Sequence, residues 1–239
     1  MFLKKFQNKL KSKLYSSEFK RFKKISFSQC GEDLIVQYIF NCIGIEKPSY
    51  IDVGAYHPFL FNNTALLYNK GSRGINIEPD PTLFKLFPEH RKNDINLNIG
   101  IGDKNDVLDF YIISSPALNT FSKEEALKYS DEGNYFINQV EKVKVLKLEN
   151  VLVDFFESSF PQFISIDAEG VDESIIRSIN FEKHFPLVIC IETISFSTSG
   201  RGLKNTNLIN YIINKGYLLY ADTYINTIFV KKDLWQNRS

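Results

Sequence analysis

Short apolar runs alternate with stretches of helical periodicity along most of the chain. Runs that predict buried strands cover residues 50–53, 74–77, 95–99, 163–166 and 187–191. Between them, apolar positions recur every three to four residues, which predicts helices over 34–43, from Asn62 or Asn63 to 69, from Asp80 onward, and over 151–156, 171–179 and 203–214. Uniformly apolar strands that alternate with helices are typical of a parallel sheet covered on both faces.

The last two strands break this alternation. Residues 217–221 and 227–230 are apolar but lie only about five residues apart, which is too close for a crossover between parallel strands. They therefore predict an antiparallel hairpin. We expect an α/β fold with a doubly wound, Rossmann-like seven-stranded sheet that ends in this hairpin. That is the class I methyltransferase arrangement, whereas a plain dinucleotide-binding fold would place another helix there.

Two further regions belong to this picture. We place one domain at residues 28–239, in which 107–113 and 143–148 predict two more strands around a polar insert at about 114–142. We interpret the insert as a lid or a substrate-side excursion. Residues 1–27 form a basic amphipathic arm, and its first 24 residues hold nine basic side chains and one acidic one. The arm is either a surface helix that contacts an anionic membrane or an acidic partner, or a solvated extension.

Composition narrows the class of protein. The chain has 239 residues, of which 44% are hydrophobic, and a net charge of +1. No stretch approaches about 18 consecutive apolar residues, so no membrane-spanning segment is predicted. Cys30, Cys42 and Cys190 lack the spacing of a metal site or a disulfide framework, which favours reduced thiols. We expect a cytoplasmic protein, and the arm leaves a peripheral membrane contact open.

The strand ends carry the candidate chemistry, because ligands of such sheets bind at the carboxyl ends of the strands. The first strand ends in Asp52 and Val53, and Gly54 in the next turn permits a close backbone approach. The second ends at Glu78, whose carboxylate can accept both hydroxyls of a ribose. A pyrophosphate needs a loop with several glycines, and this loop has one. S-adenosylmethionine (SAM) has a ribose and an adenine but no phosphate, so the sequence favours SAM.

The loops beyond these strands add candidates for the rest of the cofactor. The Tyr56-His57-Pro58 loop suits a wall beside a sulfonium. Asn63 and Thr64 at the next helix start can meet the methionine carboxylate. After the third strand, Asp103 can accept the adenine amino group, or the Gly100–Asp103 segment is a simple turn.

Three carboxylates follow the fourth and fifth predicted strands. Asp167, Glu169 and Glu192 fall on one rim of the predicted sheet. They can remove a proton from a hydroxyl acceptor, bind the ammonium of the ligand or hold a divalent metal, but their spacing is not diagnostic of a metal. His57, one loop away, is the other candidate base, and a structural role is its alternative.

Five segments then resemble a known family when they are read together. SQCGEDLIVQYIF, YIDVGAYHPFLFNNTALLYNKGSRGINIEPDP, NIGIGD, FISIDAEG and LVICIE occur in this order over about residues 26–195. In them the chain resembles the FkbM family of SAM-dependent methyltransferases. The resemblance implies that Asp52, Gly54 and Glu78 bind the cofactor. It also implies positions at the mouth of the pocket for Gln29, Glu32, Asp167 and Glu169.

The residues and the resemblance together define the expected site. The candidate catalytic residues are His57, Asp167, Glu169 and Glu192. The expected cofactor residues are Gln29, Asp52, Gly54, Ala55, Asn63, Thr64, Glu78, Pro79, Gly102, Asp103 and Asp167. SAM is the expected cofactor. A divalent metal is not predicted, but Asp167, Glu169 and Glu192 would be its ligands.

The expected function is SAM-dependent O-methylation. The resemblance implies a sugar hydroxyl of a bacterial surface polysaccharide, or its nucleotide-linked precursor, as the acceptor. We expect the insert at 114–142 to set acceptor choice. Nucleic acid is not an expected partner, because an acidic rim repels phosphate. Two alternatives stay open: a nicotinamide-dependent sugar-modifying enzyme, and a non-catalytic module that binds an anionic partner through the arm.

Overall fold

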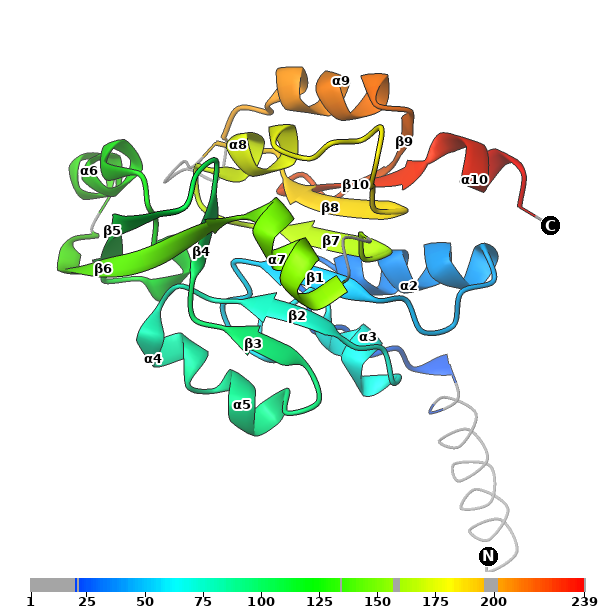
Figure 1. Ribbon diagram of the computed structural model, residues 1–239, viewed down its shortest axis with the longest axis horizontal. Coiled ribbons are helices and arrows are strands. Elements are labelled where there is room, and N and C mark those ends of the chain that lie inside the picture. The colour runs from blue at the N-terminus through cyan, green and yellow to red at the C-terminus, as the bar shows by residue number, and fades with distance from the viewer. Residues whose placement is uncertain (1–19, 21, 134, 157–159, 196–201, 239) are drawn as a thin grey trace, which may run out of the picture.

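The computed structural model describes residues 20, 22–133, 135–156, 160–195 and 202–238. Most of the predicted basic arm, residues 1–19 and 21, therefore lies outside the described residues. The main feature is a seven-stranded sheet in the order β3-β2-β1-β7-β8-β10-β9 (Figure 1). Its strands are β1 (Tyr50–Val53), β2 (Gly74–Ile77), β3 (Ile95–Leu97), β7 (Phe163–Ile166), β8 (Val188–Glu192), β9 (Tyr217–Asp222) and β10 (Asn226–Lys231).

The strand directions confirm the predicted topology. The five strands β3, β2, β1, β7 and β8 are parallel to one another. β10 is antiparallel to both β8 and β9, and it lies between them. In the centre of the sheet, Val53 pairs with Ile77 on one side and Ile166 on the other. The polar residues that follow these strands therefore emerge at the same level of the sheet.

Helices cover both faces of this sheet, as the apolar strands predict. On one face, α7 (Leu148–Phe156), α8 (Asp172–Arg177) and α9 (Thr206–Asn214) pack on strand residues such as Ile51 and Ile164. On the other, α2 (Glu32–Cys42) and α3 (Ala65–Asn69) pack on alternate residues such as Tyr50 and Phe163. Full burial of each such side chain contributes about 1.5–3 kcal/mol, so the strand ends are fixed by a rigid core.

The predicted insert is more regular than its sequence indicates. β4 (Gly100–Gly102), β5 (Asp106–Ile113) and β6 (Ile137–Lys147) form a second sheet in the order β4-β6-β5. Between β5 and β6 lie the short helix η1 (Pro116–Leu118) and helix α6 (Lys123–Glu132). Only Ala126 and Tyr129 of α6 pack into a small cluster with Ile113, which explains the weak periodicity. Figure 1 shows β5, β6 and α6 projecting together beyond the main sheet.

Three smaller differences concern helix ends. α9 begins later than the pattern predicts, because the Asn205 side chain accepts a hydrogen bond from the backbone N–H of Leu208. Leu203, the first apolar residue of the predicted helix, consequently lies outside α9 and is 81% exposed. Thr64, rather than Asn62 or Asn63, is the residue that precedes α3. A short helix, α10 (Lys232–Gln236), follows the hairpin and has no counterpart in the predicted elements.

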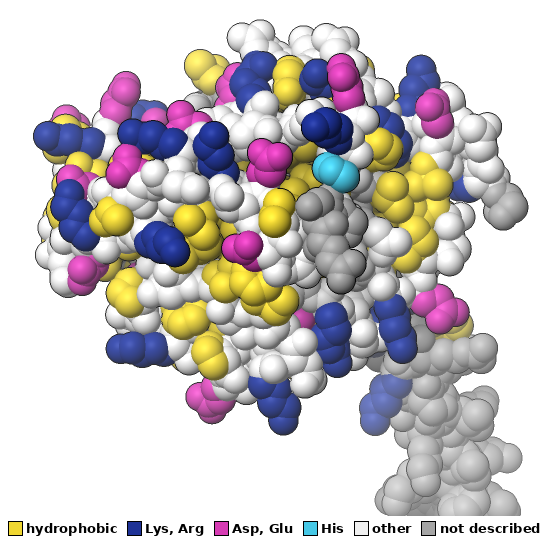
Figure 2. All heavy atoms as spheres, viewed as in Figure 1, with side chains coloured by type: hydrophobic (Ala, Val, Ile, Leu, Met, Phe, Trp, Pro, Cys, Tyr) yellow, Lys and Arg dark blue, Asp and Glu magenta, His cyan; other side chains and the backbone are white. Residues whose placement is uncertain are grey.

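Two short helices follow β2. α4 (Pro81–Phe84) begins as predicted, with the Asp80 side chain accepting backbone N–H groups, and α5 (Phe87–His90) follows it. Basic and acidic side chains are interspersed over the face shown in Figure 2, with apolar side chains exposed between them. Within the described ranges, no helix is both long enough and apolar enough to cross a bilayer.

Candidate active site

A cavity of about 420 Å³ opens at the carboxyl ends of the parallel strands. Its walls come from the ends of β1, β2, β7 and β8, from insert residues 116–119 and 121, and from residues 224–225 in the turn of the hairpin. Small-molecule sites of doubly wound sheets lie at this position and have volumes in this range. The cavity is therefore the candidate active site.

The ends of β1 and β7 come into close contact at Gly54. The backbone N–H of Asp167 donates to the carbonyl of Val53 over 3.0 Å. Gly54 has a φ of 74°, and a Cβ atom there would lie 1.8 Å from the carbonyl oxygen of Asp167. A glycine is thus required at this position. The backbone that approaches it is the loop after β7, and not a ligand as the sequence suggested.

Asp52 supports the loop above it through a buried network. Its Oδ2 accepts hydrogen bonds from the Thr64 hydroxyl at 2.8 Å and from the Asn62 amide at 3.1 Å. The buried Arg91 guanidinium donates to the same hydroxyl at 2.9 Å and pairs with Asp94 at 3.0 Å. Burial raises the pKa of Asp52, while the Thr64 hydrogen bond and the charge of Arg91 oppose that rise. This network fixes the path of residues 54–64.

Glu78 follows β2 and lines the cavity beside Gly54. One carboxylate oxygen accepts the backbone N–H of Tyr56 at 2.7 Å, and the other accepts that of Asp80 at 2.8 Å. Burial raises the pKa of Glu78 to about 8, against the effect of these two hydrogen bonds. A carboxylate offers about four acceptor positions, so two remain for a ligand.

The part of the cavity near β2 and β4 is mostly apolar. The apolar side chains that line this part are Ile77, Leu83, Ile99, Ile101, Phe110, Leu118 and Phe121. The Phe110 and Phe121 rings lie 4.7 Å apart between centroids. Asn119 anchors this wall, because its side chain donates to Asp80 and accepts the backbone N–H of Ile113, each over 2.8 Å. An aromatic base would find apolar surface here.

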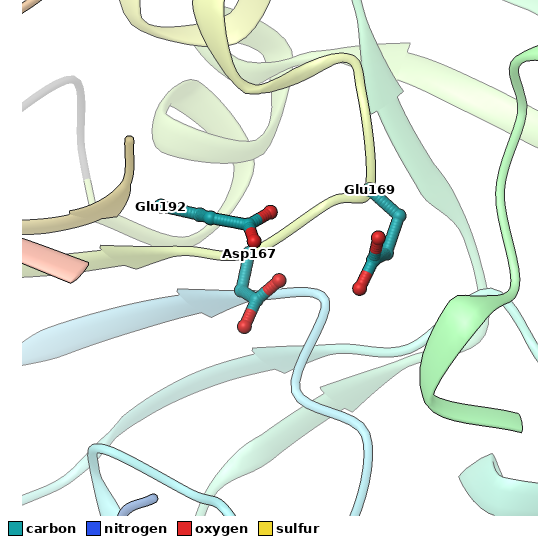
Figure 3. Close-up of side chains that lie close together, drawn as sticks. All are labelled: Asp167, Glu169 and Glu192. Carbon is teal, nitrogen blue, oxygen red and sulfur yellow. The ribbon is translucent and has the colours of Figure 1, made fainter. Parts of the chain in front are cut away.

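Asp167, Glu169 and Glu192 meet at the opposite end of the cavity, near β7 and β8. Each offers a carboxylate oxygen, and these oxygens all lie within 4.8 Å of one another. Figure 3 shows the side chains extending into a shared space from the ends of two strands and the loop between them. Burial, and then the neighbouring acidic groups, raises the pKa of Asp167 to about 7 and those of Glu169 and Glu192 well above their usual range.

Glu169 is held in place by the insert. Its φ of 45° lies in the left-handed region, and its backbone carbonyl accepts the Thr120 hydroxyl at 2.6 Å. The Tyr129 hydroxyl of α6 donates to its carboxylate at 3.0 Å. Burial and the nearby acids raise the Tyr129 pKa, so this hydroxyl stays protonated as a donor. The insert thus fixes the geometry of one of the three candidate acids.

Strained backbone marks the same cavity. Among the described residues, the non-glycine residues with positive φ are Tyr56, Phe61, Glu169 and Tyr224, and all four line the cavity. Such conformations persist only where the surroundings enforce them, and they concentrate at functional sites. The Tyr56 and Phe61 rings stack with centroids 6.3 Å apart, and about half of the Phe61 and Tyr224 side chains is exposed. Together these three rings form an aromatic rim.

Most of the predicted site residues share this cavity. The lining includes Gln29, Asp52, Gly54, Ala55, Asn63, Glu78, Pro79, Asp167, Glu169 and Glu192. Glu32 is buried outside it, where its carboxylate accepts the Thr223 hydroxyl at 2.7 Å and the Asn226 amide at 3.3 Å. The resemblance places Glu32 at the pocket mouth, but its contacts join the start of α2 to the β9–β10 hairpin.

Besides Glu32, four predicted residues do not line the cavity: His57, Thr64, Gly102 and Asp103. The His57 Nδ1 atom accepts two backbone N–H groups of its own loop. Thr64 turns inward to Asp52. Gly102 ends β4, and Asp103 follows it on the exposed surface, so the pairing of β4 with β6 carries this segment away from the predicted adenine position.

Comparison with known sequences identifies the family. A family model described as the methyltransferase FkbM domain matches residues 52–219. The chain belongs to the FkbM methyltransferase family. The match begins within β1, at Asp52, and covers the other parallel strands β2, β3, β7 and β8 with the residues that follow them. The activity of this family is methyl transfer from SAM to a small-molecule acceptor. Membership therefore excludes the two alternatives, a nicotinamide-dependent sugar-modifying enzyme and a non-catalytic binding module.

Solved structures add distant likenesses to this FkbM domain. A TehB-like SAM-dependent methyltransferase from Corynebacterium glutamicum is 11% identical, with 95% of this chain and 98% of that chain covered, at a TM-score of 0.41. A 1,6-didemethyltoxoflavin-N1-methyltransferase from Burkholderia thailandensis, with bound 1,6-didemethyltoxoflavin and S-adenosylhomocysteine, is 7% identical, with 95% and 87% covered, at 0.41. These scores are too low to bear on the site. No curated protein matches the sequence.

Proposed function

We propose that this FkbM-family chain methylates a sugar hydroxyl, which belongs to a bacterial surface polysaccharide or to its nucleotide-linked precursor. The observation that carries the proposal is the group of three carboxyl side chains, within 4.8 Å of one another, at one end of the cavity. Carboxylates accept hydrogen bonds from hydroxyls and can take their protons. The polysaccharide setting rests on the family resemblance alone.

The other end of the cavity fits the cofactor. Glu78 has two free acceptor positions, which suit the two hydroxyls of a ribose. Ile99 and Ile101 offer apolar surface to the adenine, and the Gly54 turn lacks the further glycines that a pyrophosphate needs. Bound SAM would supply a methyl group on a sulfonium centre. We assign Asn63 and Gln29, which line the cavity beyond the Gly54 turn, to the methionine arm.

The acidic trio then acts on the acceptor. Asp167, Glu169 or Glu192 accepts a hydrogen bond from the hydroxyl, orients its oxygen and removes its proton as the new bond forms. Positioning of this kind supplies a large part of the rate enhancement in transfer reactions. Tyr129 fixes the Glu169 carboxylate through its hydroxyl. We do not assign His57 as the base, because its Nδ1 already accepts hydrogen bonds from two backbone N–H groups.

The proposal is tested by incubating the full chain with SAM and a panel of saccharides, and by detecting methyl transfer with mass spectrometry. Glu169→Gln keeps the shape of the side chain but removes its basicity, so we expect kcat to fall about 10²-fold or more. Glu46→Gln, at an exposed position outside the cavity, is the matched control.

Two results would count against this function. One is product methylated only on nitrogen, and the other is a Glu169→Gln variant with wild-type kcat. Treatment with EDTA separates the two chemical roles of the trio. Retained activity assigns the three carboxyl groups to proton removal, whereas loss that Mg²⁺ restores assigns them to a metal, for which an all-oxygen donor set is suitable.

A further inference from the structure

We infer that the acceptor enters this cavity without a phosphate group, and that affinity decreases from an amino sugar, through a neutral sugar, to a phosphorylated or nucleotide-linked sugar. The inference rests on the proposed function and narrows its substrate class. It decides between the two acceptor forms that the proposal leaves open, the glycan itself and its nucleotide-linked precursor.

The ionisable lining of the cavity is acidic. Asp52, Glu78, Asp167, Glu169 and Glu192 contribute carboxyl groups, and no described lining residue is Lys, Arg or His. Proteins bind phosphate with Arg or Lys side chains, or with backbone N–H groups at the N-terminus of a helix. A diphosphate in this cavity would face several carboxyl groups at close range, and like charges repel.

Described cations near the cavity are already engaged. The Arg91 guanidinium lies beneath the 54–64 loop, where it pairs with Asp94 and donates to the hydroxyls of Tyr50 and Thr64. Lys204 lies beside the Tyr224 ring, but its Nζ pairs with Asp222 at 2.7 Å. Recruiting either cation to a phosphate would break an existing ion pair.

SAM offsets only part of the acidic charge. Its sulfonium and ammonium groups carry two positive charges and its carboxylate one negative charge, so its net contribution is one positive charge. The acidic trio at the acceptor end therefore keeps negative charge, or holds protons, when a neutral acceptor is bound. An ammonium group on the acceptor would compensate this charge directly, which places amino sugars first in the expected order.

The aromatic rim is a second and independent observation. Tyr56, Phe61 and Tyr224 line the cavity mouth, and about half of the latter two side chains is exposed. The negative face of an aromatic ring attracts an ammonium cation. Its apolar surface also packs against the C–H groups of a sugar ring, whereas it offers nothing to a phosphate. The rim and the trio thus favour the same class of acceptor.

The test is calorimetric titration of the full chain, saturated with S-adenosylhomocysteine (SAH). The probes are glucosamine, glucose, glucose 6-phosphate and UDP-glucose. We expect glucosamine to bind about tenfold more tightly than glucose, and both phosphorylated sugars to bind at least about tenfold more weakly than glucose. Glu192→Gln should weaken the binding of glucosamine about tenfold more than the binding of glucose, and Glu46→Gln should change neither.

The inference is overturned if glucose 6-phosphate or UDP-glucose binds as tightly as glucose, or if none of the four sugars binds the SAH-saturated protein. Arg201 lies outside the described residues, so an Arg201→Ala variant is included, and the expected order must persist in it. Failure of SAH itself to bind would count against the proposed function instead. The two failures are therefore distinguishable in one set of titrations.

Discussion

Replacing Gly54 by alanine tests the close contact of two strand ends on which the site depends. Gly54 has a φ of 74°, and an added Cβ would lie 1.8 Å from the backbone carbonyl oxygen of Asp167. Gly44, at the end of α2, has a φ of 76°, but an added Cβ there meets nothing within 4 Å. The two glycines form a matched pair with the same backbone conformation and different surroundings.

The expected magnitudes follow from this comparison. An alanine in the left-handed region costs about 1–2 kcal/mol, so Gly44→Ala should lower the free energy of unfolding by about that amount. In a chain of this size this corresponds to a loss of about 2–8 °C in Tm. Gly54→Ala incurs the same conformational penalty plus about 1–3 kcal/mol or more for overpacking against a backbone atom. The difference between the two variants isolates the steric contribution.

Urea unfolding measures both free energies, and calorimetric titration with SAH measures the effect on the site. We expect Gly54→Ala to bind SAH at least about tenfold more weakly, or by about 1.4 kcal/mol, because the β1 turn must move away from Asp167. Gly44→Ala should bind SAH like the wild type. Equal destabilisation by the two substitutions, or wild-type SAH affinity in Gly54→Ala, would refute the reasoning.

Three further changes probe the surroundings of the site. Arg91→Met leaves Asp94 buried without its cation, so the free energy of unfolding in urea should fall by about 3–5 kcal/mol, and an unchanged midpoint would contradict this. Since Glu78 has a pKa of about 8 and must be ionised to accept two ribose hydroxyls, SAH affinity should fall about tenfold between pH 9 and pH 7, and Glu78→Gln should remove this dependence. Tyr129→Phe removes a hydrogen bond that lowers the Glu169 pKa, so the acidic limb of the kcat–pH profile should move to higher pH; an identical profile would show that the tyrosine only packs.

The main sheet could be predicted from sequence because its inner strands, β1, β2, β7, β8 and β10, are almost wholly buried. Each of the seven predicted strands agrees with the structure within about two residues, and the five-residue spacing before β10 specified the hairpin. The insert could not be predicted in the same way. α6 buries only Ala126 and Tyr129, and residues 137–142 of β6 are exposed or half-buried, so neither segment has a strong apolar period.

The site residues also differ in whether the sequence could predict them. Asp52, Glu78, Asp167 and Glu192 could be placed together because each directly follows or ends a recognisable strand, and parallel strands end at one edge. Contacts between segments distant in sequence gave no such signal. Arg91 lies in the charged stretch EHRKND, which is typical of a surface, yet its guanidinium is buried beneath the 54–64 loop.

The same limit applies to residues from the loops. Phe61 and Tyr224 come from two turns, and only the folded chain brings them to the cavity. Tyr129 comes from a weakly periodic helix and meets the site through its hydrogen bond to Glu169. Asp103 lies outside the cavity for a related reason. The pattern places it after a strand end, but pairing between β4 and β6 continues past that point and carries it into solvent.

The position of β10 has a consequence for how the polypeptide is made. The last strand along the chain is an interior strand, inserted between β8 and β9. During synthesis, β8 and the β9 segment stay unpaired on the edges that β10 will occupy until residues 226–231 leave the ribosome. Until then the β8 edge is an unpaired template for misassociation. Any product that terminates before residue 226 therefore retains that open edge permanently.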